Sequence, residues 1–167
     1  MRKLEVFFDY ACPYCLRVHD DLLEALALHP DIRVEWRVCE AHPRPEIYER
    51  HSDLLARGMF FARECGADLH AYHRCVYHAA IVLRVNIDDP QIVADAVEGI
   101  VDRASLLKAL SEDLYESELR ENNRLAWQEY DFEAVPSYRL DGKLLKSAPG
   151  IGVSGRQIEE FLNGCLD

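Results

Sequence analysis

Two segments near the start of the chain have the apolar patterns of β-strands. Residues 3–9 contain a short apolar run without alternation, which indicates a strand buried on both faces of a sheet. In residues 32–38 apolar side chains alternate with charged ones, as in a strand with one buried face. Apolar residues at helical spacing over residues 16–27 predict a helix between the two strands.

The end of the chain has the pattern of a hairpin followed by a helix. Strand-forming residues return at 135–140 and 143–146, and the Asp-Gly dipeptide between them is typical of a tight hairpin turn. Ser154 and Gln157 have the spacing of a capping box, so they predict the start of a closing helix.

The middle of the chain, residues 46–128, contains helical patterns and no strand pattern. Asp89 before Pro90, and Asp102 before an apolar run, occupy positions typical of residues that start helices. The order of elements is therefore strand, helix, strand, a helical block, a hairpin and a final helix.

This order predicts one domain with an insertion. We expect an α/β sheet domain formed by residues 1–44 and 129–167, with residues 45–128 inserted as an all-helical subdomain. The 167 residues suit a single domain, and an apolar fraction of 49% is enough for a packed core and excludes general disorder.

The net charge limits the classes of partner. The chain has 30 acidic and 19 basic residues and a formal charge of −11, a sign that repels phosphate backbones and anionic lipids. Nucleic acid and membrane are therefore unfavourable partners, and the oligomeric state stays open. No apolar run has the length of a signal peptide or a membrane span, so we expect a cytoplasmic protein.

Two of the six cysteines, Cys12 and Cys15, form a Cys-x-x-Cys pair between the first predicted strand and the first helix. A sulfur at a helix start lies near unpaired backbone N–H groups and the positive end of the helix dipole, and both stabilise a thiolate. Such a position lowers a cysteine pKa from about 8.5 toward 7 or less. We therefore interpret Cys12 as a nucleophile and Cys15, one turn later and more buried, as the thiol that resolves mixed disulfides.

The alternatives for this pair are half of a zinc site or two unreactive core thiols. Zinc needs two more ligands of similar spacing, and the chain has no second Cys-x-x-Cys or His-x-x-x-His pair. A second cluster divides into two pairs that point in different directions on a helix, so we expect no metal there; its members are His70, His73, Cys75 and His78.

The remaining candidates are expected to be structural. We place His19 on the exposed side of the first helix. Free cysteines are common core residues, and four share no motif: Cys39, Cys65, Cys75 and Cys165. Four aromatic residues are expected to pack in a core rather than to line a peptide groove: Phe60, Phe61, Tyr72 and Tyr77.

The segment FFDYACPYC, which leads directly into a helix, resembles the thioredoxin superfamily, and CPYC itself is shared with glutaredoxins. The helical insertion resembles the DsbA-like branch, in particular FrnE-like proteins and relatives of 2-hydroxychromene-2-carboxylate isomerase. The resemblance extends to DLHAYHRCVYHAAIVLRVNIDDP and AVPSYRLDGKLL later in the chain. It implies an α/β, thioredoxin-like fold with a large helical insertion, and a thiol–disulfide oxidoreductase that needs no organic cofactor or metal.

The same resemblance assigns residues to the substrate side of the site. In this superfamily a cis-proline before a strand lies against the dithiol, and the residue before it pairs its backbone with the substrate chain. Pro136 and Val135 occupy these positions, and Pro13 and Tyr14 complete the expected substrate contacts. The implied partners are proteins that carry a disulfide or dithiol, or glutathione as a small co-substrate.

Two departures from the family pattern bear on mechanism. Many thioredoxin-like proteins carry a buried carboxylate six residues before the first cysteine; Val6 stands there, which leaves water, Glu5, Asp9 or no group to relay the proton. The isomerase relatives usually replace the first cysteine with serine and bind glutathione, whereas this chain keeps Cys12 and Cys15. Disulfide exchange is therefore favoured over a glutathione-dependent isomerase or transferase of the same fold and over a non-catalytic binding module.

Overall fold

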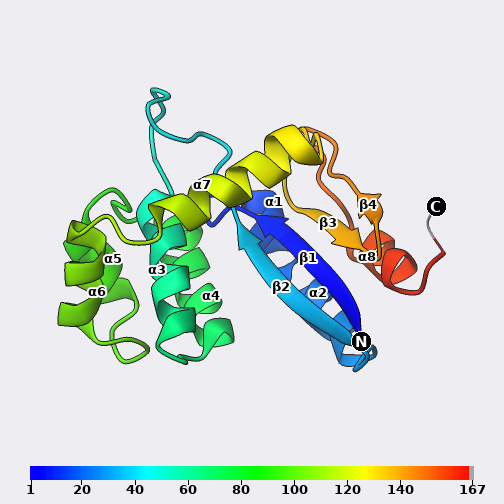
Figure 1. Ribbon diagram of the computed structural model, residues 1–167, viewed down its shortest axis with the longest axis horizontal. Helices are drawn as coiled ribbons and strands as arrows, with labels where there is room; N and C mark the ends of the chain where they lie inside the picture. Colours follow the sequence, from blue (N-terminus) through cyan, green and yellow to red (C-terminus); the bar gives the residue numbers. More distant parts are fainter. Residues whose placement is uncertain (166–167) are drawn as a thin grey trace.

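The computed structural model describes residues 1–165, in which a mixed sheet has helices on both faces (Figure 1). The strand order is β2-β1-β3-β4; β1 runs parallel to β2 and antiparallel to β3, which pairs antiparallel with β4. Segments from both ends of the chain therefore pair in one sheet. The strands are β1 (Arg2–Phe8), β2 (Ile32–Val38), β3 (Ser137–Leu140) and β4 (Lys143–Leu145).

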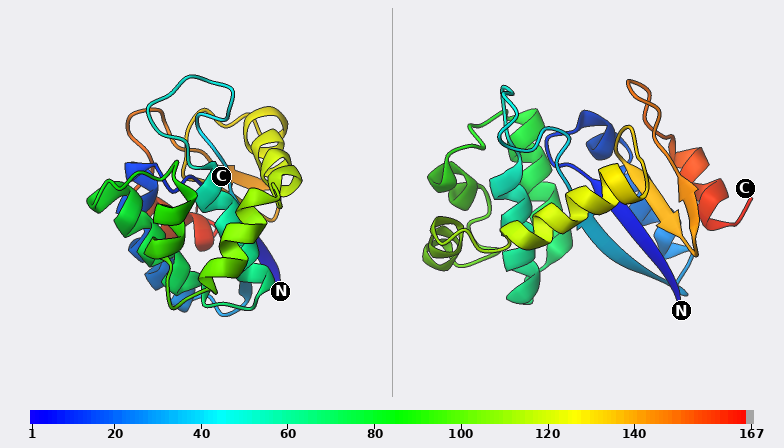
Figure 2. Two further views of the ribbon diagram at one scale, coloured as in Figure 1. Left: turned by 90° about the vertical axis from the view of Figure 1, so that its left-hand side faces the viewer. Right: turned by 45° about the horizontal axis from the view of Figure 1, so that its top comes forward.

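Different helices cover the two faces of this sheet. α2 (His19–Ala27) lies behind the strands in Figure 1 and packs against α8 (Gly155–Leu162). α7 (Glu116–Arg124) and its π-helical continuation η2 (Leu125–Glu129) cross the opposite face, in front of the strands in the right-hand view of Figure 2.

Side chains alternate along β1 between these two faces. Phe7 contacts the ring of Tyr130, which follows η2, whereas Phe8 contacts the rings of Trp36 and His73. Residues 4–8 are all buried, which agrees with the unbroken apolar run that predicted a two-sided strand.

Apart from the short helix after β1, the remaining helices form a block at the left of Figure 1, which a long loop of residues 39–52 connects to β2. α7 leads from this block back to the sheet, where it packs against β2. The boundaries expected for the helical insertion, residues 45–128, stay a prediction. Within the described residues, no helix has the length and apolar character needed to cross a membrane. The block contains α3 (Asp53–Glu64), α4 (Leu69–Tyr77), η1 (His78–Val82), α5 (Pro90–Ala96) and α6 (Arg103–Ser111).

The local signals at helix starts and at the hairpin are confirmed. Asp89 accepts a hydrogen bond from the Gln91 amide, and Asp102 accepts one from the Ser105 amide. Both hydrogen bonds of the capping box at α8 are present. The two turn residues between β3 and β4 have φ angles of 51° and 87°, the left-handed values that Asp-Gly hairpin turns require.

The first helix differs from its predicted form. It breaks at Val18, which has φ −107° and ψ 5°, into α1 (Pro13–Arg17) and α2. The expectation that His19 is exposed is wrong: the residue is 6% exposed and its ring contacts Trp36 and Tyr77. The break restarts the helix at His19, so periodicity counted from the CPYC end misplaces its faces.

The aromatic residues of the helical block contribute to core packing. Phe60, Tyr72 and Tyr77 are at most 4% exposed, and Phe61 packs against the same core from its edge. The interpretation of these side chains as core residues is therefore confirmed.

Gly58 on α3 packs against the hydroxyl group of Tyr72, which donates a hydrogen bond to the Leu55 carbonyl at 2.7 Å. A methyl group at position 58 would overlap with this hydroxyl. Alanine normally adds up to about 1 kcal/mol to helix stability over glycine. For Gly58→Ala we instead expect a net loss of about 1–3 kcal/mol in the free energy of unfolding, because the core is overpacked.

Chemical denaturation measures this change. Tyr72→Phe removes the overlapping oxygen, so Gly58→Ala should cost less in that background than in the wild-type protein. Equal costs in the two backgrounds would contradict the explanation.

Candidate active site

A tight turn after β1 places the dithiol at the start of α1. The Asp9 carboxylate accepts a hydrogen bond from the Ala11 amide at 2.9 Å, and the Asp9 carbonyl accepts one from the Cys12 amide at 3.0 Å. Cys12 then occupies the N-cap of α1, and Pro13 is the first helical residue, where a missing N–H costs nothing. The junction between strand and helix inferred from the sequence is therefore present.

The two sulfurs differ in exposure and surroundings. Cys12 is half-buried and its Sγ lies 3.5 Å from the carbonyl oxygen of Val135, to which it donates a hydrogen bond. Cys15 is 3% exposed and packs in the core. The peptide bond between Val135 and Pro136 is cis, and both residues are buried. The fold thus brings together Cys12 and Val135, which are 123 residues apart in the sequence.

The pKa values of the two thiols move in opposite directions. A hydrogen bond from the Cys15 side chain lowers the pKa of Cys12, with further help from the backbone N–H groups of Cys15 and Tyr14, against the opposing effects of burial and the Asp9 charge. Burial raises the pKa of Cys15 well above its ordinary value, and the interaction with Cys12 adds to the rise. The pair therefore consists of one partly exposed thiol with a lowered pKa and one buried thiol with a raised pKa.

The residues between the two cysteines have different environments. Pro13 is exposed, whereas the Tyr14 hydroxyl donates a hydrogen bond to the Gly150 carbonyl at 2.9 Å. The Arg17 guanidinium lies over the Tyr14 ring and donates to the Ile151 carbonyl at 2.7 Å. Tyr14 and Arg17 thereby hold the loop before α8 against α1. The expected substrate contacts of Pro13 and Tyr14 stay predictions.

Asp9 is the acidic side chain that lies close to the dithiol. It is 4% exposed, burial raises its pKa, and its negative charge acts on both cysteines. Its second oxygen accepts a hydrogen bond from the Ala41 amide at 2.9 Å, and the Ser52 side chain adds another.

Glu5, the other acidic candidate, belongs to the opposite face of the sheet. Its carboxylate pairs with Arg37 at 2.9 Å and with Arg139 at 2.8 Å. On the other face of β3, burial raises the pKa of Tyr138, the neighbour of Arg139, and the nearby Cys15 and Cys12 add to the rise. Of the two side chains that the sequence left open, Asp9 is therefore the one that lies near the dithiol.

Cys39 is buried near Asp9 and Cys12, whereas the remaining cysteines and the histidine cluster take no part in the contacts of this site described above. The Cys39 thiol is buried and donates to the Phe8 carbonyl at 3.5 Å, Cys75 is partly buried, and Cys65 and Cys165 are exposed. Within residues 1–165, no three or more His, Cys, Asp or Glu side chains are arranged to hold a metal ion. His73 is completely buried between the helical block and the sheet, whereas its neighbours His70 and His78 are exposed.

Comparisons with known proteins agree on the fold. A family model described as DSBA-like thioredoxin domain matches residues 3–165. The Bacillus subtilis protein YwbO is 25% identical to this chain in an alignment that covers 94% of this chain and 96% of that protein.

Two solved structures illustrate the similarity. A probable DsbA oxidoreductase from Streptomyces coelicolor superimposes with a TM-score of 0.81 at 16% identity, over 99% of this chain and 90% of that one. Oxidised BdbD from Bacillus subtilis gives a TM-score of 0.73 at 14% identity, over 98% and 85%. The predicted α/β, thioredoxin-like fold with a large helical insertion is thereby confirmed.

Proposed function

Because the chain belongs to the DSBA-like thioredoxin domain family, we propose that it is a thiol–disulfide oxidoreductase whose working group is the CPYC dithiol. In this proposal the Cys12 thiolate attacks a substrate disulfide, which forms a mixed disulfide and releases the other substrate sulfur as a thiolate. Cys15 then attacks Cys12, so the protein gains a disulfide and the substrate leaves as a dithiol. The reverse sequence oxidises a dithiol substrate.

The observation that carries this proposal is the placement of the two thiols: Cys12 is partly exposed at the N-cap of α1 beside Val135, and Cys15 is buried one turn later. Their pKa values shift accordingly in opposite directions. A lowered pKa raises the fraction of Cys12 that is thiolate and makes this sulfur a better leaving group for the resolving step. A raised pKa keeps Cys15 protonated until a mixed disulfide has formed beside it. Two buried structural thiols would show no such division.

The substrate side of the site supports an extended protein chain as substrate. The Val135 carbonyl points to Cys12 and can accept a hydrogen bond from a substrate backbone amide once the sulfur has reacted. We assign Val135, Pro136, Pro13 and Tyr14 to this surface. Proteins with a disulfide or dithiol are the proposed substrates, with glutathione as a small co-substrate, and the electrons balance without a metal or organic cofactor. The cytoplasm is the proposed location.

The test is catalysis of insulin reduction with dithiothreitol as the terminal reductant. We expect the wild-type protein to accelerate the reaction by at least about tenfold, and Cys12→Ser to return it to the uncatalysed rate. Cys65→Ser, which changes an exposed thiol away from the site, is the matched control and should keep full activity. Tight glutathione binding without acceleration would favour the isomerase or transferase, and neither property would favour a binding module.

A further inference from the structure

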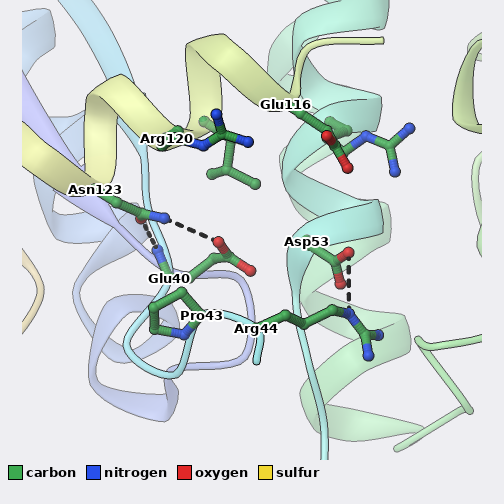
Figure 3. A pocket seen from close by; sticks show the side chains of 9 residues that line it. Glu40, Pro43, Arg44, Asp53, Glu116, Arg120 and Asn123 are labelled. Atoms are coloured by element: carbon green, nitrogen blue, oxygen red, sulfur yellow. Dashed lines mark hydrogen bonds and ion pairs between the residues drawn. The ribbon is translucent and has the colours of Figure 1, made fainter. Parts of the chain in front are cut away.

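A second buried carboxylate, Glu40, lies beyond Asp9 at the end of β2. Glu40 is 5% exposed, and the Asn123 side chain holds it from α7: its amide donates to Glu40 Oε2 at 2.9 Å and its carbonyl accepts from the Glu40 backbone at 2.7 Å (Figure 3). The other carboxylate oxygen, Oε1, is buried and has no hydrogen-bond partner within the described residues.

Glu40 lines a pocket of about 170 Å³ between α7, α3 and the loop after β2 (Figure 3). Asp53 lines the same pocket; one of its oxygens accepts from Arg44 at 3.3 Å, and the other is buried without a partner in the described part of the chain. The exposed side chains of Glu116 and Arg120 form its rim, so solvent has access. A pocket of this size has room for several water molecules, for which the carboxylate oxygens are polar partners.

Residues next to the two carboxylates of the pocket form hydrogen bonds with Asp9, which lies near the dithiol. The Ala41 amide, which directly follows Glu40, donates to the Asp9 carboxylate at 2.9 Å. Ser52, which directly precedes Asp53, forms a side-chain hydrogen bond with the same carboxylate. The charge of Asp9 acts on both cysteines and also on Glu40, so this carboxylate lies within electrostatic reach of the dithiol and of the pocket.

We propose that Glu40 transfers protons between the Asp9 carboxylate and solvent in the pocket, and thereby controls the step in which Cys15 resolves the mixed disulfide. This inference rests on the proposed function. When the Cys15 sulfur attacks Cys12, its proton passes to Asp9, the new bond joins the two protein sulfurs, and the substrate leaves as a thiolate. The proton then passes from Asp9 to Glu40 and to water. Glu40 touches neither sulfur and acts through Asp9.

The charges around Glu40 suit this role. Burial raises the pKa of Glu40 to about 7, with a contribution from the charges of Asp53 and Asp9, so it exchanges protons near neutral pH. The hydrogen bond from Asn123 and the charge of His51 act in the opposite direction. The charged or titratable groups that face Glu40 come from the end of β1, the end of β2 and the loop after it, α3 and α7: Asp9, Cys39, Arg44, His51, Asp53, Arg57, Glu116 and Arg120.

Reaction with the disulfide reagent DTNB separates the two chemical steps. Attack by Cys12 releases one thionitrobenzoate at a rate that depends on reagent concentration, and resolution by Cys15 releases the second at a rate that does not. The accessible thiols outside the site are replaced in all variants, by Cys65→Ser, Cys75→Ser and Cys165→Ser. Glu40→Gln keeps the size of the side chain and its hydrogen bond with Asn123.

For Glu40→Gln we expect an attack phase within about twofold of the parent and a resolution phase slowed about tenfold near neutral pH. The inflection near pH 7 in the resolution rate should also disappear. Glu24→Gln changes an exposed carboxylate on α2, outside the pocket, and should leave both phases unchanged. An unchanged resolution phase in Glu40→Gln, or equal slowing of both phases, would overturn the proposal.

Chemical rescue distinguishes proton transfer from a structural role. In Glu40→Ala, formate can enter the enlarged pocket and replace the missing carboxylate, so we expect it to accelerate resolution at least about threefold with no effect on attack. Absence of rescue would overturn proton transfer by Glu40. A parent protein that shows no concentration-independent second phase would instead count against the proposed function itself.

Discussion

Replacement of Cys15 by serine is expected to leave the protein covalently joined to its substrates through Cys12. Cys12 is partly exposed and has a lowered pKa, so attack on a disulfide continues in this variant. The thiol that would release the mixed disulfide is gone, so adducts accumulate. Cys12→Ser keeps only the buried Cys15, whose raised pKa leaves little thiolate, and should form at least about tenfold fewer adducts.

Non-reducing electrophoresis after exposure to a disulfide-bearing protein measures these adducts. Both variants should also carry Cys65→Ser, Cys75→Ser and Cys165→Ser, because accessible thiols elsewhere on the surface form adducts of their own. Equal amounts from Cys15→Ser and Cys12→Ser would show that the nucleophile is assigned wrongly. No adduct from either variant would favour the glutathione-dependent enzyme or the binding module.

The features that could be predicted from the sequence depend on residues close together in the chain. The CPYC pair after a strand needs only the turn at Asp9 and the proline at the helix start, and both lie within four residues of Cys12. The helix caps at Asp89, Asp102 and Ser154 are equally local. Each of these signals depends on neighbouring residues in the chain and not on tertiary contacts, so the structure retains all of them.

Features that depend on distant contacts could not be predicted. Val18 looks like a regular helical residue in the sequence, yet the helix breaks there and turns His19 toward Trp36 and His73. Which of Glu5 and Asp9 lies near the dithiol likewise depends on the ion-pair and hydrogen-bond partners of each carboxylate. Glu5 is held by arginines from two other strands, which no spacing within β1 reveals.

Glu40 was not among the candidate residues predicted from the sequence, although its position after β2 contains a signal. Strand β2 alternates as far as Val38, and Glu40 follows where the parallel strands β1 and β2 both end. Ligand and catalytic groups gather at this end of parallel strands. By this rule, a charged residue at this position is as good a candidate for the site as Asp9. Its burial, however, depends on Asn123 from α7, more than 80 residues later.

The contact between the helical block and the sheet contains a buried histidine that should make the free energy of unfolding depend on pH. His73 of α4 is completely buried, its ring centroid lies 4.6 Å from that of Trp36, and its Nδ1 shares a hydrogen bond of 2.7 Å with the Tyr10 hydroxyl. Its Nε2 is buried without a partner in the described residues. Burial lowers the pKa of His73 to about 3, and the nearby His19 and His70 add to the effect.

The direction of the pH dependence follows from this lowered pKa. The folded protein keeps His73 neutral, whereas the unfolded chain protonates it below its usual pKa of 6.5. The contribution of His73 to stability is therefore complete above that pH and is lost as the pH falls from 6.5 toward 3. Asp9 and Glu40 act in the opposite sense, because their pKa values are raised in the folded protein, so total stability alone does not isolate the histidine.

A comparison between variants isolates it. Between about pH 8 and about pH 5, the wild-type protein should lose about 2 kcal/mol more free energy of unfolding than His73→Gln, which cannot titrate but can still bond to Tyr10. Urea denaturation at each pH provides the values, and His78→Gln, which changes an exposed histidine of the same segment, should follow the wild-type curve. If the curves of the wild-type protein and His73→Gln run parallel, His73 takes up no proton on unfolding. Any loss of stability in acid would then come from other groups, such as His19, whose pKa is also lowered by burial.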